Sequence, residues 1–208
     1  MRDREYRRDQ HGRRYEDHVA PINQLVDQLR EERGEWMPYV APIYGGVDAR
    51  VLALFRDPGP KTRDERGSGM LSLENDDQSA ERHLSLVQRS GMLVDELVVW
   101  NTYPWYINRK PTTREIDEGL APLQRLFSLL PNLAVVIAHG GEAQTAFRRF
   151  TRIHAGAVRG VGEVINTYHT SRQALWTPDP AERTRREGKL VADYARAVAF
   201  LNGFDVDR

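Results

Sequence analysis

Asp57, Asn101 and His169 are the residues of this chain best placed for chemistry, because each lies just beyond a short apolar run. A carboxylate can position or activate a water molecule, an amide presents both a donor and an acceptor, and an imidazole can donate a hydrogen bond. Together these roles fit the recognition of a small polar ring.

Four short apolar runs predict the strands that must position these side chains. Continuous apolar strands that alternate with helices are typical of a parallel sheet covered by helices on both faces and joined by right-handed crossovers. We therefore expect a three-layer αβα fold with a central four-stranded parallel sheet. Ligands of such sheets bind beyond the carboxyl ends of the strands, so the four strand ends should meet at one rim. The predicted strands are Val51–Phe55, Leu97–Trp100, Leu133–Ile137 and Glu163–Thr167.

The segments around these strands predict helices. Apolar residues recur at helical spacing over 19–29, and Gly34 ends the pattern. Thr112 and Glu115 have the spacing of a capping box, which would open a helix that continues to Leu130. The other predicted helices are Ser79–Ser90, Glu142–Arg152 and Ala181–Leu201.

The composition narrows the chemistry that the chain can perform. Its 208 residues include no cysteine, which excludes disulfides, thiolate nucleophiles and cysteine-ligated zinc or iron–sulfur clusters. The spacing of His139 and His154 matches no metal motif, so we expect neither a metal ion nor another cofactor. Basic and acidic residues are equal in number, 30 of each, so no overall basic excess indicates nucleic acid or membrane as a partner.

The length of the chain fits a single domain, which we place at residues 18–208. Residues 1–17 are densely charged with almost nothing apolar to bury, so we expect a flexible segment and assign it no function. No apolar run approaches the length of a transmembrane helix, and the charged N-terminus lacks the apolar stretch of a signal peptide. We therefore expect a cytoplasmic protein without a membrane partner.

The strand ends resemble the motifs of the uracil-DNA glycosylase superfamily. Its first motif, a strand followed by a loop with an acidic or amide residue before proline, is similar to Phe55–Pro60. Its second, a strand that ends in a base-reading asparagine, is similar to Trp100–Pro104, and Asn108–Thr112 continues much as in the iron–sulfur branch. Its third, the His-Pro-Ser-Pro loop, is matched in part by His169–Arg172. The order and spacing agree over about 50–175.

The chain also departs from this pattern. Thr170 and Arg172 replace the two prolines of the third motif. The aromatic residue that many members stack on the base has no clear equivalent, and the nearest positions hold Met70 and Leu71. The lack of cysteine excludes the branch that binds an iron–sulfur cluster. The resemblance is therefore to a divergent member without a cluster.

The resemblance implies a DNA glycosylase that flips a uracil or a modified pyrimidine out of DNA and hydrolyses its N-glycosidic bond, leaving an abasic site. Asp57 would orient or activate the water, and its charge would favour the cationic sugar. His169, as a neutral donor, would stabilise the oxyanion that develops on the base. Asn101 would read the edge of the base. The other base-binding candidates are Arg56, Met70, Leu71 and Tyr103.

The same resemblance implies DNA as the partner of a protein that acts as a monomer. A flipped base leaves a gap in the stack, and Arg172, Gln173 and Leu175 are the candidate wedge. The candidate DNA contacts are Gly59, Lys61, Ser68, Arg109, Lys110, Gly140, Ser171, Arg172 and Gln173.

Three alternatives remain beside excision of uracil. The substrate could be a larger pyrimidine, including a hypermodified base of invading phage DNA, which would give a role in defence instead of repair. The protein could bind DNA or a damaged base without cutting it. A nucleotide-binding loop at Gly59–Thr62 is disfavoured, because Pro60 separates the glycine from Lys61 and removes an amide that should face phosphate.

Overall fold

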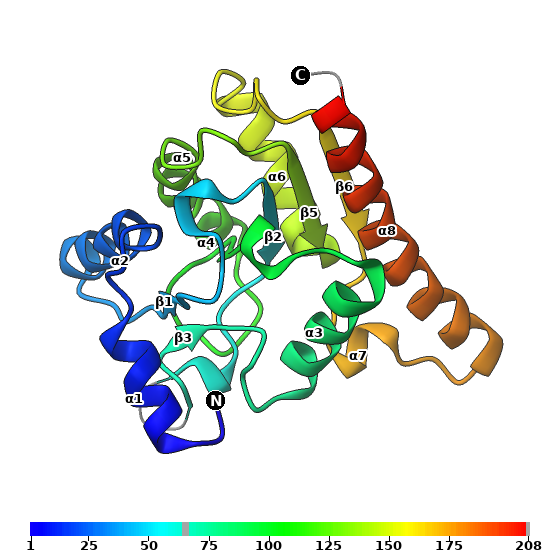
Figure 1. Ribbon diagram of the computed structural model, residues 1–208, viewed down its shortest axis with the longest axis horizontal. Helices are drawn as coiled ribbons and strands as arrows, with labels where there is room; N and C mark the ends of the chain where they lie inside the picture. Colours follow the sequence, from blue (N-terminus) through cyan, green and yellow to red (C-terminus); the bar gives the residue numbers. More distant parts are fainter. Residues whose placement is uncertain (64–66, 207–208) are drawn as a thin grey trace.

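The structure, a computed structural model, describes residues 1–63 and 67–206. Its centre is a four-stranded sheet in which all neighbouring strands are parallel (Figure 1). The predicted three-layer αβα architecture is confirmed, because helices cover both faces of this sheet. In spatial order the strands are β4 (Leu97–Asn101), β2 (Val51–Phe55), β5 (Val135–His139) and β6 (Glu163–Thr167).

The burial of the strands explains why they are apolar throughout. All residues of β5 and of β4, which lies at the other edge of the sheet from β6, are buried, and so are the first four of β2. The edge strand β6 instead alternates, with Ile165 and Thr167 buried and Val164 exposed. The sheet core is therefore closed at its centre and open to solvent only along β6.

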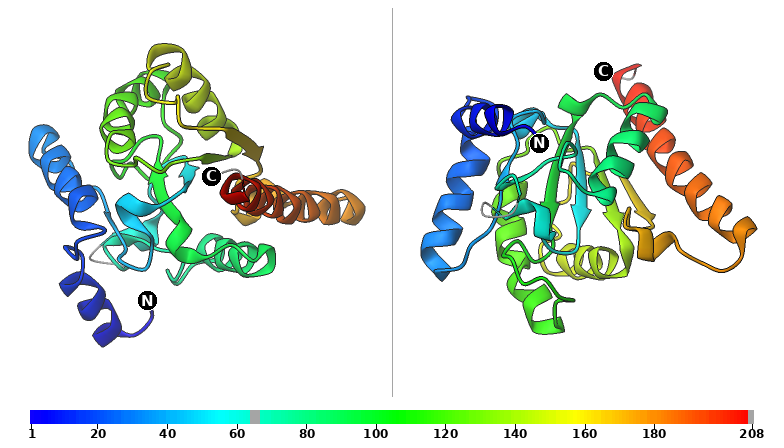
Figure 2. Two further views of the ribbon diagram at one scale, coloured as in Figure 1. Left: turned by 45° about the horizontal axis from the view of Figure 1, so that its top comes forward. Right: turned by 90° about the horizontal axis from the view of Figure 1, so that it is seen from below.

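The helices lie in two layers. α8 packs against β6 and α3, whereas α6 packs against β5 and β2. Figure 2 shows α3 and α8 on one side of the sheet and α5 and α6 on the other. The helices are α1 (Arg4–Gly12), α2 (Ala20–Arg33), α3 (Gln78–Ser90), α4 (Thr113–Glu118), α5 (Leu120–Phe127), α6 (Gly140–Ile153), α7 (Arg172–Leu175) and α8 (Pro180–Val206).

The helix predicted from Thr112 to Leu130 is in fact two helices, α4 and α5, which meet at Gly119. A Cβ atom at Gly119 would lie 1.7 Å from the carbonyl oxygen of Thr102, so the chain passes the loop after β4 too closely for any other residue. The capping box of Thr112 and Glu115 is confirmed at the start of α4.

The N-terminal segment differs from the expectation of a flexible tail, because its residues 4–12 form α1. Polar contacts hold this helix in place instead of a buried apolar face. The Tyr6 hydroxyl donates to the Glu74 carboxylate over 2.7 Å, and the His11 ring contacts the carbonyl oxygen of Ser68 over 2.7 Å. Both partners belong to the segment that leads into α3, so the first helix supports that segment.

A second, two-stranded parallel sheet joins β1 (Tyr39–Val40) to β3 (Met70–Leu71). Asn23 on α2 secures β1, since its amide bonds both the N–H and the carbonyl oxygen of Val40. This small sheet fixes the path of the chain between β2 and α3.

Candidate active site

A cavity of about 770 Å³ opens at the carboxyl ends of the central strands. Asp57 lines it from the loop after β2, Asn101 from the last position of β4, and His169 from the loop after β6. Gly140, directly after β5, completes the set of strand ends. The structure therefore brings the carboxylate, the amide and the imidazole to the walls of one cavity.

Asp57 is nearly enclosed, with 5% of its side chain exposed. Burial raises the pKa of Asp57, and the ion pair with the Arg56 guanidinium opposes this shift. The Arg56 Nε donates to the Asp57 Oδ1. A carboxylate that has lost most of its hydration accepts a proton more readily than one in water, which suits the activation of a water molecule.

His169 is held as a neutral hydrogen-bond donor. The backbone N–H of Ser171 donates to its Nδ1 over 2.9 Å, so the ring proton of the neutral form is on Nε2. Burial lowers the pKa of His169 to about 4, and the positive charge of Arg56 adds to this effect. Gly140 permits the close packing, since its φ is +83° and a Cβ there would lie 3.3 Å from the His169 Cβ.

Asn101 has hydrogen-bonding capacity that the described part of the protein does not use. It is 3% exposed, and its Oδ1 is buried without a hydrogen-bond partner. In the sheet register it lies opposite Phe55, which also lines the cavity. A buried acceptor left unpaired costs about 1–3 kcal/mol, which a ligand with a matching donor would recover.

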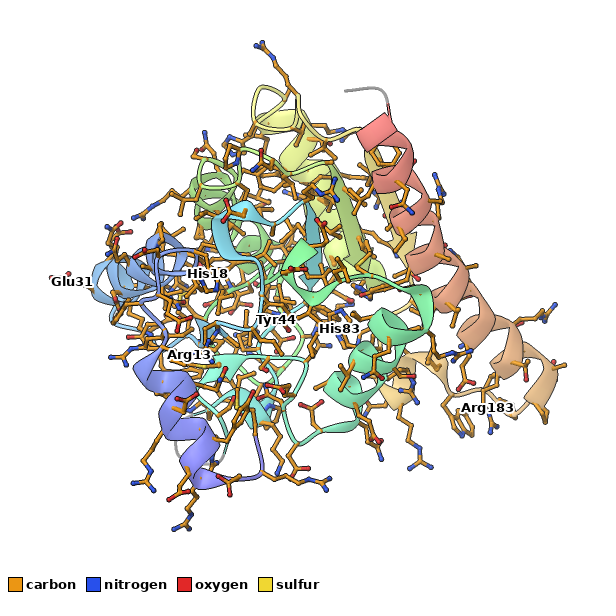
Figure 3. The ribbon with its side chains drawn as sticks, in the orientation of Figure 1. Arg13, His18, Glu31, Tyr44, His83 and Arg183 are labelled. Carbon is orange, nitrogen blue, oxygen red and sulfur yellow. The ribbon has the colours of Figure 1, made fainter. Side chains whose placement is uncertain are left out.

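Three further wall residues share this property and were not foreseen from the sequence. Asn75 Oδ1, His83 Nε2 and Thr170 Oγ1 are buried with no hydrogen-bond partner among residues 1–63 and 67–206. Figure 3 places His83 and Tyr44, another wall residue, near the middle of the molecule. The polar run before α3 was a usable signal for Asn75, whereas His83 lies inside a helix with nothing to mark it.

An aromatic cluster forms the base of the cavity. The Phe55 ring stacks on His139 with centroids 4.2 Å apart and meets the edge of His169 at 5.5 Å. His139 is fixed on both sides, because Nδ1 bonds the carbonyl oxygen of Tyr168 and Nε2 bonds the Tyr194 hydroxyl. Phe55 thus offers a rigid aromatic surface in the wall, where the sequence suggested no clear stacking residue.

Two helices begin at the cavity. The first residues of α3, Gln78 to Ala80, and those of α6, Gly140 and Gly141, line its wall. Asp77 caps α3 through the N–H groups of Ser79 and Ala80. Helix N-termini favour negative charge, which the Asp77 carboxylate already supplies at the start of α3.

The comparison with solved structures identifies this architecture. SMUG2 of Pedobacter heparinus matches with a TM-score of 0.51 and 12% sequence identity, over 91% of this chain and 86% of that chain. The chain has a uracil-DNA glycosylase-like fold. A mimivirus UNG variant in complex with UGI matches with a TM-score of 0.41 and 16% identity, over 83% of this chain and 72% of that chain. No protein-family model and no curated protein sequence matches the chain.

Within the glycosylase-like fold, several predicted base and DNA contacts lie outside the cavity. Met70 is fully buried in β3, and only its neighbour Leu71 reaches the wall. The Tyr103 hydroxyl bonds Arg33 and Glu35, which holds the ring among the residues after α2. Ser68 is likewise buried, and its hydroxyl bonds the backbone of β3. The small sheet, which the sequence did not reveal, accounts for the burial of Met70 and the hydrogen bonds of Ser68.

The other predicted DNA contacts fall into three groups. Gly59, Lys61, Ser171 and Gln173 line the cavity, as does Arg56. Arg109 is paired with Glu115, and Lys110 with Glu142, so carboxylates neutralise both side chains. Arg172 lines a different groove.

Two features that would indicate other functions are not found in the part of the chain that the structure describes. No group of three His, Asp or Glu side chains there is arranged to hold a metal ion. No helix within 1–63 and 67–206 is both long and apolar enough to span a membrane.

Proposed function

We propose that the protein is a DNA glycosylase whose cavity receives a pyrimidine flipped out of DNA and whose side chains promote hydrolysis of the N-glycosidic bond. The observation that supports this proposal is the meeting of Asp57, Asn101 and His169 at one cavity of a glycosylase-like fold. A cavity of about 770 Å³ is in the usual range for a small-molecule site and can take a whole nucleotide.

The reaction breaks the bond between the sugar C1′ and the base N1. The bonding electrons leave with the base, whose negative charge spreads to a carbonyl oxygen of the base, and the sugar becomes cationic. The Nε2–H of His169 donates to that oxygen, and this hydrogen bond strengthens as the charge develops. Water adds to C1′ and transfers its proton to the Asp57 carboxylate, which then releases it to solvent, while the base takes a proton from solvent.

Asn101 selects the base in this proposal. Its Oδ1 accepts a ring N–H, and its Nδ2 donates to a carbonyl oxygen of the base, so a base with the reverse pattern leaves the buried acceptor unpaired. Phe55 supplies the surface on which the ring stacks. The volume of the cavity also accommodates a substituted ring, so a modified pyrimidine, including one from phage DNA, belongs to the proposed substrate class together with uracil.

The test is base release from a panel of oligonucleotides, single-stranded and duplex, that carry uracil, hypoxanthine, hydroxymethyluracil or a bulky modified cytosine. Free base is measured by mass spectrometry and abasic sites by alkaline cleavage. Asp57→Asn is compared with Asp95→Asn, a matched change beside the opposite end of the sheet. Loss of release in the first variant alone, with DNA binding retained, supports the proposal.

Two other results would contradict the proposed glycosylase activity. If wild-type protein binds DNA but releases no base from the panel, the protein is a non-catalytic DNA or damaged-base binder. If it binds no DNA at all, both functions are excluded.

A further inference from the structure

A second groove, of about 590 Å³, lies between α3 and α8, with α7 at one end. Arginines dominate its lining, four of them against two glutamates. Figure 3 shows one of these arginines, Arg183, on the part of α8 that projects beyond the sheet. The charged lining residues are Arg82, Arg89, Arg172, Arg183, Glu81 and Glu187.

The arginines of this groove differ from those elsewhere near the cavity, because none is paired with a carboxylate within the described chain. Arg82 donates to the carbonyl oxygen of Thr170 over 2.6 Å, and Arg183 to that of Thr177 over 2.9 Å. Arg89 and Arg172 form no ion pair with residues 1–63 or 67–206. Their charge is therefore available to an anionic ligand.

The groove also has an apolar side. Leu86, Leu175 and Leu190 form a buried floor, each no more than 3% exposed. Trp176, at the end of α7, is 58% exposed although it is the largest side chain of the lining. A basic groove with an exposed aromatic ring is the arrangement on which single-stranded nucleic acids stack their bases.

The groove is adjacent to the candidate active site. Gln78 lines both, and the hydrogen bond from Arg82 ends on Thr170, between His169 and Ser171. A strand that lies in the groove would therefore lead directly into the cavity.

We propose that this groove holds an unpaired stretch of DNA next to the flipped nucleotide, with phosphates on Arg89 and Arg172 and one base stacked on Trp176. The inference rests on the proposed function and sharpens it, since it makes single-stranded DNA the preferred substrate.

The test uses an oligodeoxyadenylate, which contains no pyrimidine, so that binding is measured without turnover. The double variant R89A/R172A is compared with R152A/R159A, which removes one arginine in the last turn of α6 and one beyond it. We expect the first pair to lower affinity at least 10-fold and to reduce the slope of log K against log salt by about 1.4, the value for two phosphates of a single strand. The second pair should change neither.

Trp176 provides an independent readout. Trp176→Ala should weaken binding about 5- to 100-fold, and Trp176→Phe should restore part of the loss, because a ring can still stack. In wild-type protein, binding should quench tryptophan fluorescence, and the quenching should disappear in Trp176→Phe. Thermal melting of each variant confirms that it is folded.

The inference is overturned if R89A/R172A binds as tightly as wild type, or if a duplex of the same length competes as well as the single strand. These results do not depend on base release. A protein that releases no base from the panel can still lose DNA binding in R89A/R172A, which would support the groove alone. If R89A/R172A releases base as fast as wild type at low substrate concentration, the glycosylase function stands and the groove proposal fails.

Discussion

The two ends of the central sheet treat their polar groups in opposite ways. At the amino ends, Arg50 before β2 and Glu96 before β4 form a two-fold hydrogen-bonded ion pair, with both distances 2.7 Å. At the carboxyl ends, buried polar atoms of Asn101, His83 and Thr170 have no partner in the described chain. The same sheet thus pairs its charged groups at the amino end and leaves polar atoms without partners at the carboxyl end.

This difference indicates that the polar residues at the amino end stabilise the fold, whereas those at the carboxyl end are available to bind a ligand. An unpaired buried polar atom costs about 1–3 kcal/mol, so several around one cavity lower stability unless something binds there. Changes at the carboxyl end should therefore affect activity more than stability, and changes at the amino end should do the reverse.

The largest expected effect is that of Asp57→Asn. We expect base release to fall about 10²- to 10⁴-fold, because the water loses its proton acceptor. The free energy of unfolding should stay equal or rise, since burial already disfavours the charged carboxylate. Single-turnover kinetics and urea unfolding measure the two quantities. A loss of stability in step with activity would mean that Asp57 is a structural residue.

The next largest effect concerns pH. Burial lowers the pKa of His83 and of His169 to about 4, so the folded protein keeps both rings neutral where the unfolded chain protonates them. Stability is therefore complete above about pH 6.5 and decreases as the pH falls toward 4, by up to about 3 kcal/mol for each ring. Urea midpoints across this range measure the slope, which His83→Phe should reduce. A flat profile would show that the rings are protonated in the fold.

A smaller effect is expected at the amino end of the sheet. Glu96→Gln should lower the free energy of unfolding by about 1–3 kcal/mol, because Arg50 is left without its half-buried partner. Base release should be unchanged. The exposed Glu31→Gln serves as the matched control and should change neither property. If Glu96→Gln lost base release without losing stability, the claim that the amino end of the sheet stabilises the fold and the carboxyl end supports activity would be wrong.

The smallest effect is that of Gly140→Ala. Its positive φ and the 3.3 Å approach to His169 predict a cost of about 1 kcal/mol and a several-fold loss of base release as the ring shifts. Gly91→Ala has a similar φ, +75°, but nothing within 4 Å, and should lose stability alone. Equal activity of the two variants would mean that the close approach is not needed.

The sequence predicted those elements whose burial or capping leaves a recognisable pattern of residues. Strands β2, β4 and β5 were recognisable because they are buried and therefore continuously apolar, and the ends of β2 and β4 gave Asp57 and Asn101. His169 follows the edge strand β6, whose residues alternate between buried and exposed. The capping box of α4 was recognisable because it is a local pattern.

The remaining features depend on contacts that no local pattern reveals. The small sheet of β1 and β3 has two residues in each strand, too few for any periodicity. Helix α1 is polar and is held by bonds to Glu74 and Ser68, which are more than 50 residues away. Tyr103 turns away from the cavity because its hydroxyl bonds Arg33 and Glu35, which are about 70 residues away in the chain.

The most direct test of the central claim is a crystal structure of Asp57→Asn with a single-stranded oligonucleotide that carries a 2′-fluoro deoxyuridine, whose glycosidic bond resists hydrolysis. We predict the uracil ring in the 770 Å³ cavity, stacked on Phe55, with its edge on Asn101 and a carbonyl oxygen within hydrogen-bond distance of the His169 Nε2. A strand that crosses the protein with its base outside the cavity would contradict the account.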